Sequence, residues 1–229
     1  MRAVLFDKDG TLFDFQTTWG GWASDLMADY ARGDAAVLAR LDAAFGIDVT
    51  ARRFRRGSPF VAGTEAEGLA ILKQVLPDWA EDELVAVRRS AQARARPVPV
   101  GDVAACLDAV AALGCALAVV TNDNETDARA QLADLGVLDR FGTVIGYDSG
   151  FGSKPAPGMC LGAAAALGVA PAACVMVGDS THDLHAGRAA GMACVGVLTG
   201  VATREDLAPH ADVVLDDIHG LPAWLAASL

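Results

Sequence analysis

The chain is short of positive charge and of long apolar runs, and both shortages exclude classes of protein. Lys and Arg together number 18 against 29 Asp and Glu, which gives a net charge of -11 over 229 residues. So acidic a chain argues against nucleic acid or an anionic membrane as a partner. Apolar residues form 53% of the chain, yet no continuous apolar stretch is long enough to span a bilayer. We therefore expect a globular protein with a sizeable core and neither of these partners.

Cysteine is scarce, and no secretion signal opens the sequence. The five cysteines are odd in number, widely spaced and embedded in apolar sequence: Cys106, Cys115, Cys160, Cys174 and Cys194. This pattern is typical of small buried core residues in a reducing compartment. The chain also runs from Met1 directly into an apolar segment at residues 4–6, without the pattern of a signal peptide. Both features predict a cytoplasmic protein.

Lysine is the rarer of the two basic residues, with three lysines beside fifteen arginines. One of the three, Lys154, lies in the loop Gly152-Ser153-Lys154-Pro155. In a chain whose basic residues are mostly arginine, a lysine in a loop of this kind indicates a need for its compact, strongly hydrated charge.

Two carboxylates one residue apart, Asp7 and Asp9, follow the apolar run at residues 4–6 and precede Gly10. The apolar run predicts a buried strand. Two anionic groups this close cost repulsion and desolvation, which a cation, a phosphate or a proton transfer can offset. A solvated turn is the alternative, since Asp and Gly are common turn residues.

Polar residues also follow two later apolar runs. Residues 116–120 lead into Thr121-Asn122-Asp123, and residues 175–177 lead into the segment 178–183, which contains Asp179 and Asp183. In an open parallel sheet, ligands bind at the carboxyl ends of the strands. We therefore expect these segments to converge with Asp7 and the Lys154 loop on one site.

The order of the predicted elements indicates an α/β fold, a Rossmann-like parallel sheet flanked by helices. Residues 13–98 are far too long for a strand-to-helix loop and have apolar residues at helical spacing, so they predict an inserted α-helical cap domain. The catalytic core is then residues 1–12 and 99–229. Within it we expect strands at 116–121, 143–146, 173–177, 193–198 and 212–215, and helices at 102–113, 125–135, 158–167, 183–190 and 220–229.

The residues in these segments carry a family resemblance. Residues 7–14, Thr121-Asn122, Lys154-Pro155, Gly178-Asp179-Ser180 with Asp183, and residues 186–192 resemble the haloacid dehalogenase-like (HAD) superfamily, in its phosphoglycolate phosphatase-like branch. The match spans the core in the family's order. It departs at Phe15, where many relatives carry a small hydroxyl residue, and across residues 15–98, so the resemblance bears on the chemistry and does not extend to the substrate.

The resemblance implies a magnesium-dependent phosphatase that hydrolyses a small phosphomonoester, phosphoglycolate-like, through an aspartyl-phosphate. Phosphoryl transfer to a carboxylate needs a nucleophile, a cation, donors for the phosphate oxygens and an acid for the leaving group. We assign the nucleophile to Asp7 and the general acid and base to Asp9. The metal ligands are Asp7, the backbone carbonyl of Asp9, and Asp179, with Asp183 in support. Thr121, Lys154 and Asn122 would bind phosphoryl oxygens, Gly10 would let the backbone approach the phosphate, and Thr11 would brace the turn.

A basic stretch in the inserted segment bears on the substrate. Arg52, Arg53, Arg55 and Arg56 lie close together, and one or two of them, with Arg52 and Arg56 as the candidates, would grip an anionic group on the leaving alcohol. A solvated helix face is the alternative. Phosphoglycolate is the first substrate to consider, with sugar phosphates, nucleotides and pyrophosphate behind it.

The same residues also bear on other functions. A phosphomutase shares the core chemistry and stays open. A non-enzymatic aspartyl-phosphate signalling domain is disfavoured, because its phosphorylated Asp lies on the third strand of a chain about half this length. The spacing of a calcium loop or a nucleotide P-loop is missing. His182 and His185 are expected to be surface or packing residues, since no cysteine cluster accompanies them.

The expected partner is a small phosphorylated metabolite, bound by a monomer or homodimer.

Overall fold

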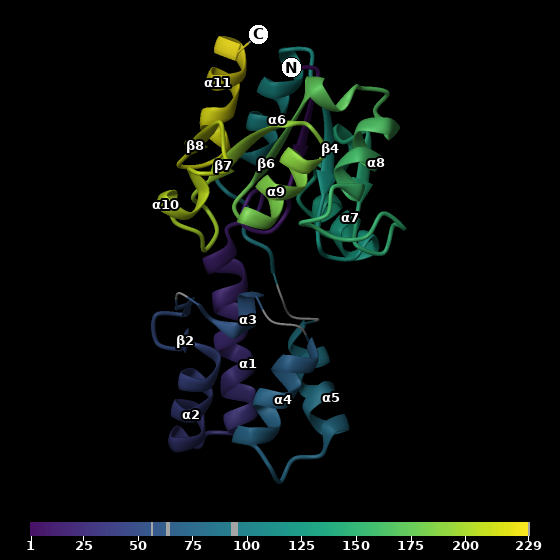
Figure 1. Cartoon of the computed structure of the whole chain (residues 1–229). Coiled ribbons are helices and arrows are strands. Elements are labelled where there is room, and N and C mark those ends of the chain that lie inside the picture. Colours follow the sequence, from purple (N-terminus) through teal and green to yellow (C-terminus); the bar gives the residue numbers. More distant parts are fainter. Residues whose placement is uncertain (56, 63–64, 93–95, 229) are drawn as a thin grey trace. The chain divides into compact units, whose positions relative to one another are not determined.

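The computed structural model describes residues 1–55, 57–62, 65–92 and 96–228, and the chain divides into two compact units. The first, here called the sheet unit, comprises Met1–Asp14 and Pro99–Leu229. The second, the helical unit, comprises Phe15–Val98. In Figure 1 the colours run from purple at the N-terminus to yellow at the C-terminus, and the purple and blue helices belong to the helical unit, which is inserted near the start of the chain. Each unit has its own hydrophobic core.

A parallel sheet of six strands forms the middle of the sheet unit, in the order β5-β4-β1-β6-β7-β8. The strands are β1 (Ala3–Phe6), β4 (Ala116–Val120), β5 (Thr143–Ile145), β6 (Cys174–Gly178), β7 (Ala193–Val197) and β8 (Val213–Leu215). In the register of the sheet, Phe6 of β1 lies between Val119 of β4 and Val177 of β6. The residues that follow these three strands therefore meet at one edge of the sheet.

Helices cover both faces of this sheet, because its strands are apolar on both sides. Val4 and Phe6 pack in a cluster with the first group of helices, and Ala3 and Leu5 pack in a second cluster with the other group. The first group is α6 (Val103–Ala112), α7 (Glu125–Asp134) and α11 (Leu221–Ser228); the second is α8 (Gly158–Ala166), α9 (Thr181–Ala189) and α10 (Arg204–Leu207). Short helical turns η2 (Leu138–Arg140), η3 (Pro171–Ala173) and η4 (Ile218–Gly220) complete the connections. This arrangement confirms the predicted Rossmann-like class.

The helical unit consists mainly of short helices around an aromatic core. Its elements are η1 (Gln16–Gly20), α1 (Gly21–Ala31), α2 (Ala35–Phe45), α3 (Pro59–Ala62), α4 (Glu65–Val75) and α5 (Glu81–Gln92), with two short strands, β2 (Ile47–Asp48) and β3 (Arg53–Phe54). Tyr30 lies in the centre and donates a hydrogen bond to the carbonyl of Leu84 at 2.9 Å. The sequence pattern predicted the helices and missed the antiparallel pair of β2 and β3, because two-residue strands leave no alternating apolar pattern.

The cysteines and the lengths of the helices complete the description of the fold. All five cysteines are unpaired and buried, as predicted. Among the residues described here, no helix combines the length and the apolar character that crossing a bilayer requires.

Candidate active site

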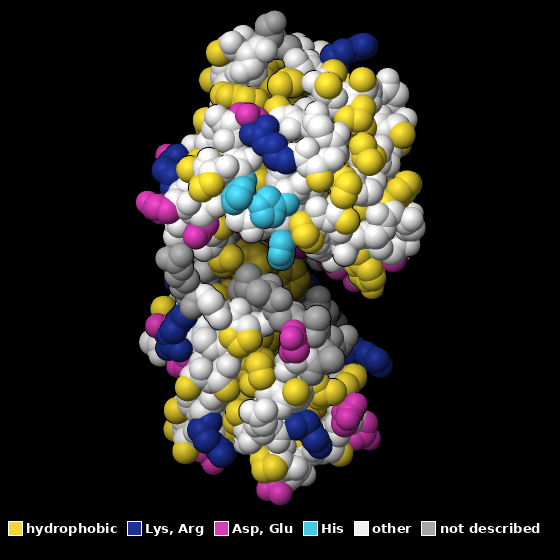
Figure 2. Space-filling model, viewed as in Figure 1, with side chains coloured by type: hydrophobic (Ala, Val, Ile, Leu, Met, Phe, Trp, Pro, Cys, Tyr) yellow, Lys and Arg dark blue, Asp and Glu magenta, His cyan; other side chains and the backbone are white. Residues whose placement is uncertain are grey.

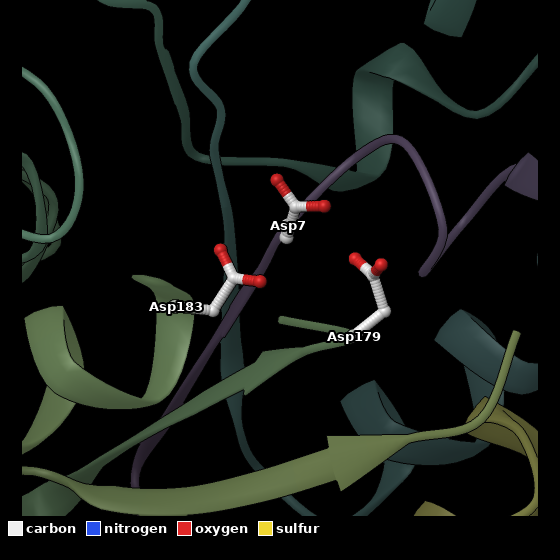
Figure 3. A group of neighbouring side chains, drawn as sticks. All are labelled: Asp7, Asp179 and Asp183. Carbon is white, nitrogen blue, oxygen red and sulfur yellow. The ribbon is translucent and has the colours of Figure 1, made fainter. Parts of the chain in front are cut away.

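Three carboxylates meet at the carboxyl edge of the sheet. Asp7 follows β1, Asp179 follows β6, and Asp183 lies in the first turn of α9. One oxygen from each lies within 4.8 Å of the other two, and all three residues are buried. Figure 3 shows the three side chains pointing into one common space. An all-oxygen donor set of this kind suits a hard divalent cation such as Mg²⁺, so the residues fit the metal that the sequence predicts.

Lys154 is the cation that accompanies these carboxylates. Its Nζ lies 2.5 Å from Oδ1 of Asp7 and 2.5 Å from Oδ1 of Asp183, and it donates a third hydrogen bond to the carbonyl of Val120 at 3.0 Å. An ammonium group has three donors, so this arrangement uses them all. Its position next to Asp7 agrees with the expected site, while a contact between Lys154 and a phosphoryl oxygen stays a prediction.

Burial and crowding shift the protonation of this group of residues. Burial raises the pKa of Asp7 to about 7; Lys154 opposes this change, and Asp183 and Asp9 add to it. Burial also raises the pKa of Asp179 well above its usual range, and repulsion from Asp183 and Asp7 adds to the effect. For Lys154, burial lowers the pKa, but attraction to Asp183 and Asp7 outweighs it, so the pKa is raised. Without a metal, the site therefore holds its protons more tightly than exposed carboxylates do.

Asp183 serves a helix as well as the site. Its Oδ2 accepts hydrogen bonds from the backbone N–H of Ser180 at 3.0 Å and from the Ser180 hydroxyl at 2.6 Å. The Ser180 hydroxyl in turn accepts one from the N–H of Asp183, which completes a capping box at the start of α9. The cap fixes the carboxylate, and its other oxygen, Oδ1, lies against Lys154. Asp183 therefore caps α9 with one carboxylate oxygen and contacts Lys154 of the site with the other.

Thr121 and Asn122 follow β4 and lie beside the same loop. Thr121 is buried, and its Oγ1 accepts a hydrogen bond from the N–H of Asp123 at 3.1 Å. The Asn122 side chain forms two hydrogen bonds with the backbone of Lys154, one as acceptor and one as donor. Its Oδ1 accepts from the Lys154 N–H at 2.9 Å, and its Nδ2 donates to the Lys154 carbonyl at 3.1 Å. This contact gives Asn122 a clear part in placing Lys154, whereas its contact with phosphate stays a prediction.

Glycines make room for Asp179. Gly10 has a φ of +89°, and a Cβ added to it would lie 2.4 Å from the carboxyl carbon of Asp179. A Cβ added to Gly200, in the loop after β7, would lie 1.7 Å from Oδ2 of Asp179. Thr199 holds the two loops together, because its hydroxyl donates to the carbonyl of Gly10 at 2.5 Å. The sequence pointed to Gly10 but not to Thr199 or Gly200, whose loop carries no charged or repeated feature.

Asp9 and Thr11 lie in the turn that follows β1. The Asp9 carboxylate forms an ion pair with Lys8, with Oδ2 and Nζ 2.7 Å apart, and it does not belong to the group of three carboxylates. Thr11 is fully buried, and its hydroxyl has no hydrogen-bond partner among the residues that the structure describes. The turn itself is closed by the N–H of Leu12, which donates to the carbonyl of Lys8 at 2.9 Å.

Lys8 is another residue at this edge of the sheet to which the sequence pattern gave no role. It is one of the chain's three lysines and stands between the two motif aspartates, and its side chain is completely buried. Burial lowers its pKa, but attraction to Asp9 and Asp123 outweighs that effect and leaves the pKa raised. The rarity of lysine, which drew attention to Lys154, was the signal that could have identified Lys8 as well.

The predicted arginines lie in the helical unit, and only one of the two can be placed. Arg52 forms a bidentate ion pair with Asp25, with Nη1 2.7 Å from Oδ1 and Nη2 2.8 Å from Oδ2. Its Nη2 also donates to the carbonyl of Gly21 at 2.8 Å. It lines a cavity of about 180 Å³ together with Thr17, Thr18, Gly21, Trp22, Asp25, Ala91 and Arg96. Arg56 lies outside the described residues.

Histidine side chains, in cyan in Figure 2, lie close together on the face of the sheet unit that the view shows. His182 and His185 are both exposed, and the His185 ring packs edge-to-face against His210, with ring centroids 4.4 Å apart. Among the described residues, the only group of three or more potential metal ligands from His, Cys, Asp and Glu is that of Asp7, Asp179 and Asp183. The position of His182 and His185 agrees with a surface and packing role.

Comparisons with known proteins agree with this geometry. The family described as haloacid dehalogenase-like hydrolase matches residues 1–191. A phosphoglycolate phosphatase from Xylella fastidiosa is 34% identical over 221 residues, covering 95% of this chain and 90% of that relative.

Solved structures share the fold across the whole chain. A candidate β-phosphoglucomutase from Thermotoga maritima superposes with a TM-score of 0.79 at 21% identity, covering 100% of both chains. A HAD family hydrolase from Deinococcus radiodurans, solved with bound phosphate and sodium, gives a TM-score of 0.72 at 24% identity and covers 100% of this chain and 96% of its own. These likenesses establish the architecture, and the family match confirms the resemblance seen in the sequence. The chain belongs to the haloacid dehalogenase-like hydrolase family.

Proposed function

We propose that this protein is a magnesium-dependent phosphatase that hydrolyses a small phosphomonoester through an aspartyl-phosphate on Asp7. The observation that carries the proposal is the convergence of Asp7, Asp179 and Asp183 on one buried space, with Lys154 beside them. The phosphoglycolate phosphatase from Xylella fastidiosa, 34% identical over nearly the whole chain, supports the reaction class.

Asp7 suits the role of nucleophile because it is held rigidly. Its backbone N–H donates to the carbonyl of Val177 at 2.8 Å, and its Oδ1 is held by Lys154. In the first step, a carboxylate oxygen of Asp7 bonds to phosphorus while the bond from phosphorus to the leaving oxygen breaks. Asp9 gives its proton to that oxygen, so the product leaves as a neutral alcohol.

Water completes the reaction at the same residues. Asp9 now takes a proton from a water molecule, whose oxygen bonds to phosphorus as the bond to Asp7 breaks. Inorganic phosphate leaves, and Asp7 and Asp9 return to their starting forms. A bound Mg²⁺, held by Asp7 and Asp179 with Asp183 behind them, would neutralise the negative charge of the phosphoryl group. Lys154 contributes a second positive charge close to the oxygen of Asp7 that it holds.

The helical unit is proposed to act as a cap that selects the leaving alcohol. Its insertion directly after the turn that carries Asp9 supports this role, because a unit that closes over a site shields the reaction from water. Arg52 lines the cavity of the helical unit, and its ion pair with Asp25 uses only part of its five N–H donors. A carboxylate on the alcohol, as in phosphoglycolate, is the group we expect Arg52 to recognise.

The test is an initial-rate screen of phosphate esters with and without Mg²⁺, run on wild type and on Asp7→Asn. We expect phosphate release that needs the metal and that falls by about a thousandfold or more in Asp7→Asn, with an unchanged circular dichroism spectrum. Near-normal turnover by Asp7→Asn would contradict the proposal. Isomerised sugar phosphate in place of inorganic phosphate would instead identify a phosphomutase.

A further inference from the structure

The side chain of Lys8 is the most completely buried charge at the carboxyl edge of the sheet, and the mechanism above does not use it. Its exposed fraction is 0%, compared with 20% for the Asp9 side chain with which it pairs. A buried charge is costly unless every donor finds a partner, so the contacts of the ammonium group show what holds it there.

Three acceptors surround this ammonium group. Nζ lies 2.7 Å from Oδ2 of Asp9 and 3.2 Å from Oδ2 of Asp123, and it donates to the side-chain oxygen of Gln131. The ring of Phe13 closes the fourth side, with its centroid 5.8 Å from Nζ. Because an ammonium group has three donors, the network leaves none unused.

The partners other than Asp9 are anchored by the fold. Gln131 lies on α7, and Asp123 lies in the loop before that helix, where its Oδ1 accepts from the N–H of Asn124 at 2.9 Å. Phe13 forms backbone bridges with Asp9 and Pro99. The position of Nζ is therefore set by α7 and by the turn. The ion pair with Nζ in turn restrains the carboxylate of Asp9.

We propose that Lys8 is a positioning residue for the Asp9 carboxylate: it holds this group where it can protonate the leaving oxygen and activate water. The inference rests on the proposed function of Asp9. A proton donor displaced by about 1 Å can lose on the order of a hundredfold in rate, so a fixed cation next to Asp9 has a kinetic consequence. The alternative, in which Lys8 only neutralises buried charge, predicts a loss of stability without a change in leaving-group preference.

The test compares Lys8→Met with wild type on two esters, p-nitrophenyl phosphate and the best alkyl phosphate found in the screen. An alkoxide needs the proton from Asp9, whereas p-nitrophenolate leaves readily without it. We expect kcat/KM of Lys8→Met to fall about 10- to 100-fold for the alkyl ester and less than about threefold for the aryl ester. With the aryl ester, a burst of p-nitrophenol should precede slower turnover, because hydrolysis of the aspartyl-phosphate also needs Asp9.

The matched control is Lys73→Met, since Lys73 is exposed on α4 and binds only the carbonyl of Trp79 among the partners described. It should leave both rates unchanged. If Lys8→Met does not fold, the double variant Lys8→Met/Asp123→Asn carries the same test, because it removes one charge of each sign. In the Asp9→Asn background, Lys8→Met should no longer alter the ratio of the two rates. An equal loss for both esters, or no loss, would overturn the positioning role.

Crystal structures separate this inference from the proposed function. In wild type the Asp9 carboxylate should lie within hydrogen-bond distance of Nζ, and in Lys8→Met or its double variant it should be displaced. An Asp9 carboxylate that keeps its place without the ammonium group overturns the inference whatever the activity. A wild-type enzyme that hydrolyses neither ester contradicts the proposed function, and the structures then decide the role of Lys8 alone.

Discussion

Divalent cations should stabilise this protein strongly, and the buried carboxylates allow the size of the effect to be worked out. Asp7, Asp179 and Asp183 bring three carboxyl groups together beside the one positive charge of Lys154. A cation that binds only the folded state adds RT ln(1 + [L]/Kd), about 2.7 kcal/mol at a hundred times its dissociation constant. For a chain of this length, that corresponds to an increase in Tm of about 5 to 10 °C.

The increase should depend on pH, with a sign that follows from the pKa of Asp7. Its pKa is raised from 3.8 to about 7 in the metal-free protein, so between these values the folded state binds more protons than the unfolded state. The stability of the metal-free protein therefore falls as pH rises through this window, by up to about 4 kcal/mol for one such group. Metal must displace those protons, so the increase in Tm should be larger at about pH 8 than at about pH 5.5.

Differential scanning fluorimetry with and without Mg²⁺ at both pH values measures the effect, and Asp179→Asn supplies the control. Two charges about 4 Å apart repel by about 4 kcal/mol at an effective dielectric constant of 20. Replacing this carboxyl group should therefore raise the Tm of the metal-free protein at any pH at which Asp179 is ionised, while the response to Mg²⁺ falls below about 2 °C. The same response to Mg²⁺ in both proteins and at both pH values would refute the reasoning.

Three substitutions test other parts of the structure. Asn122→Ala removes both side-chain hydrogen bonds to the Lys154 backbone, so kcat should fall about 10- to 100-fold while Tm drops by only a few degrees; an unchanged kcat would show that Lys154 needs no such support. Gly200→Ala places a Cβ 1.7 Å from Oδ2 of Asp179, so the Mg²⁺ concentration for half-maximal activity should rise about tenfold or more, and an unaltered metal titration would contradict the close approach. Arg52→Ala should lower kcat/KM about 10- to 100-fold for an ester that carries a carboxylate and spare p-nitrophenyl phosphate. Arg55→Ala, which breaks the ion pair with Asp42 in the same unit, is its control, and equal losses in both variants would argue against recognition by Arg52.

Most strands of the sheet unit could be predicted from sequence because they are apolar runs with a polar residue at the end, as β1 has Asp7 and β4 has Thr121. The predicted strand at 116–121 is β4 at Ala116–Val120, and the predicted helix at 158–167 is α8 at Gly158–Ala166. The meeting of Asp7 with Asp179 also followed, since parallel strands place their carboxyl ends at one edge. What failed were elements too short to show a period, such as α10 and the pair of β2 and β3.

Contacts between distant segments could not be predicted residue by residue. Asn122 follows a strand, but its bonds to the Lys154 backbone depend on how a loop 32 residues away folds. Gly200 had no signal, because its importance comes from the volume that the Asp179 side chain occupies. The network of Lys8 likewise needs Gln131, which lies 123 residues further along the chain.

The burial of two of the three lysines has a practical consequence for chemical labelling. Lys8 has no exposed surface and Lys154 almost none, whereas Lys73 is exposed on α4 of the helical unit. Amine-reactive dyes and cross-linkers act on accessible, uncharged amines, so apart from the α-amino group they should modify Lys73 alone. Such labelling therefore places a fluorophore at one defined lysine of the helical unit in the unaltered protein, with no cysteine introduced and no lysine removed. Its emission would follow the movements of that unit while the catalytic edge stays chemically intact.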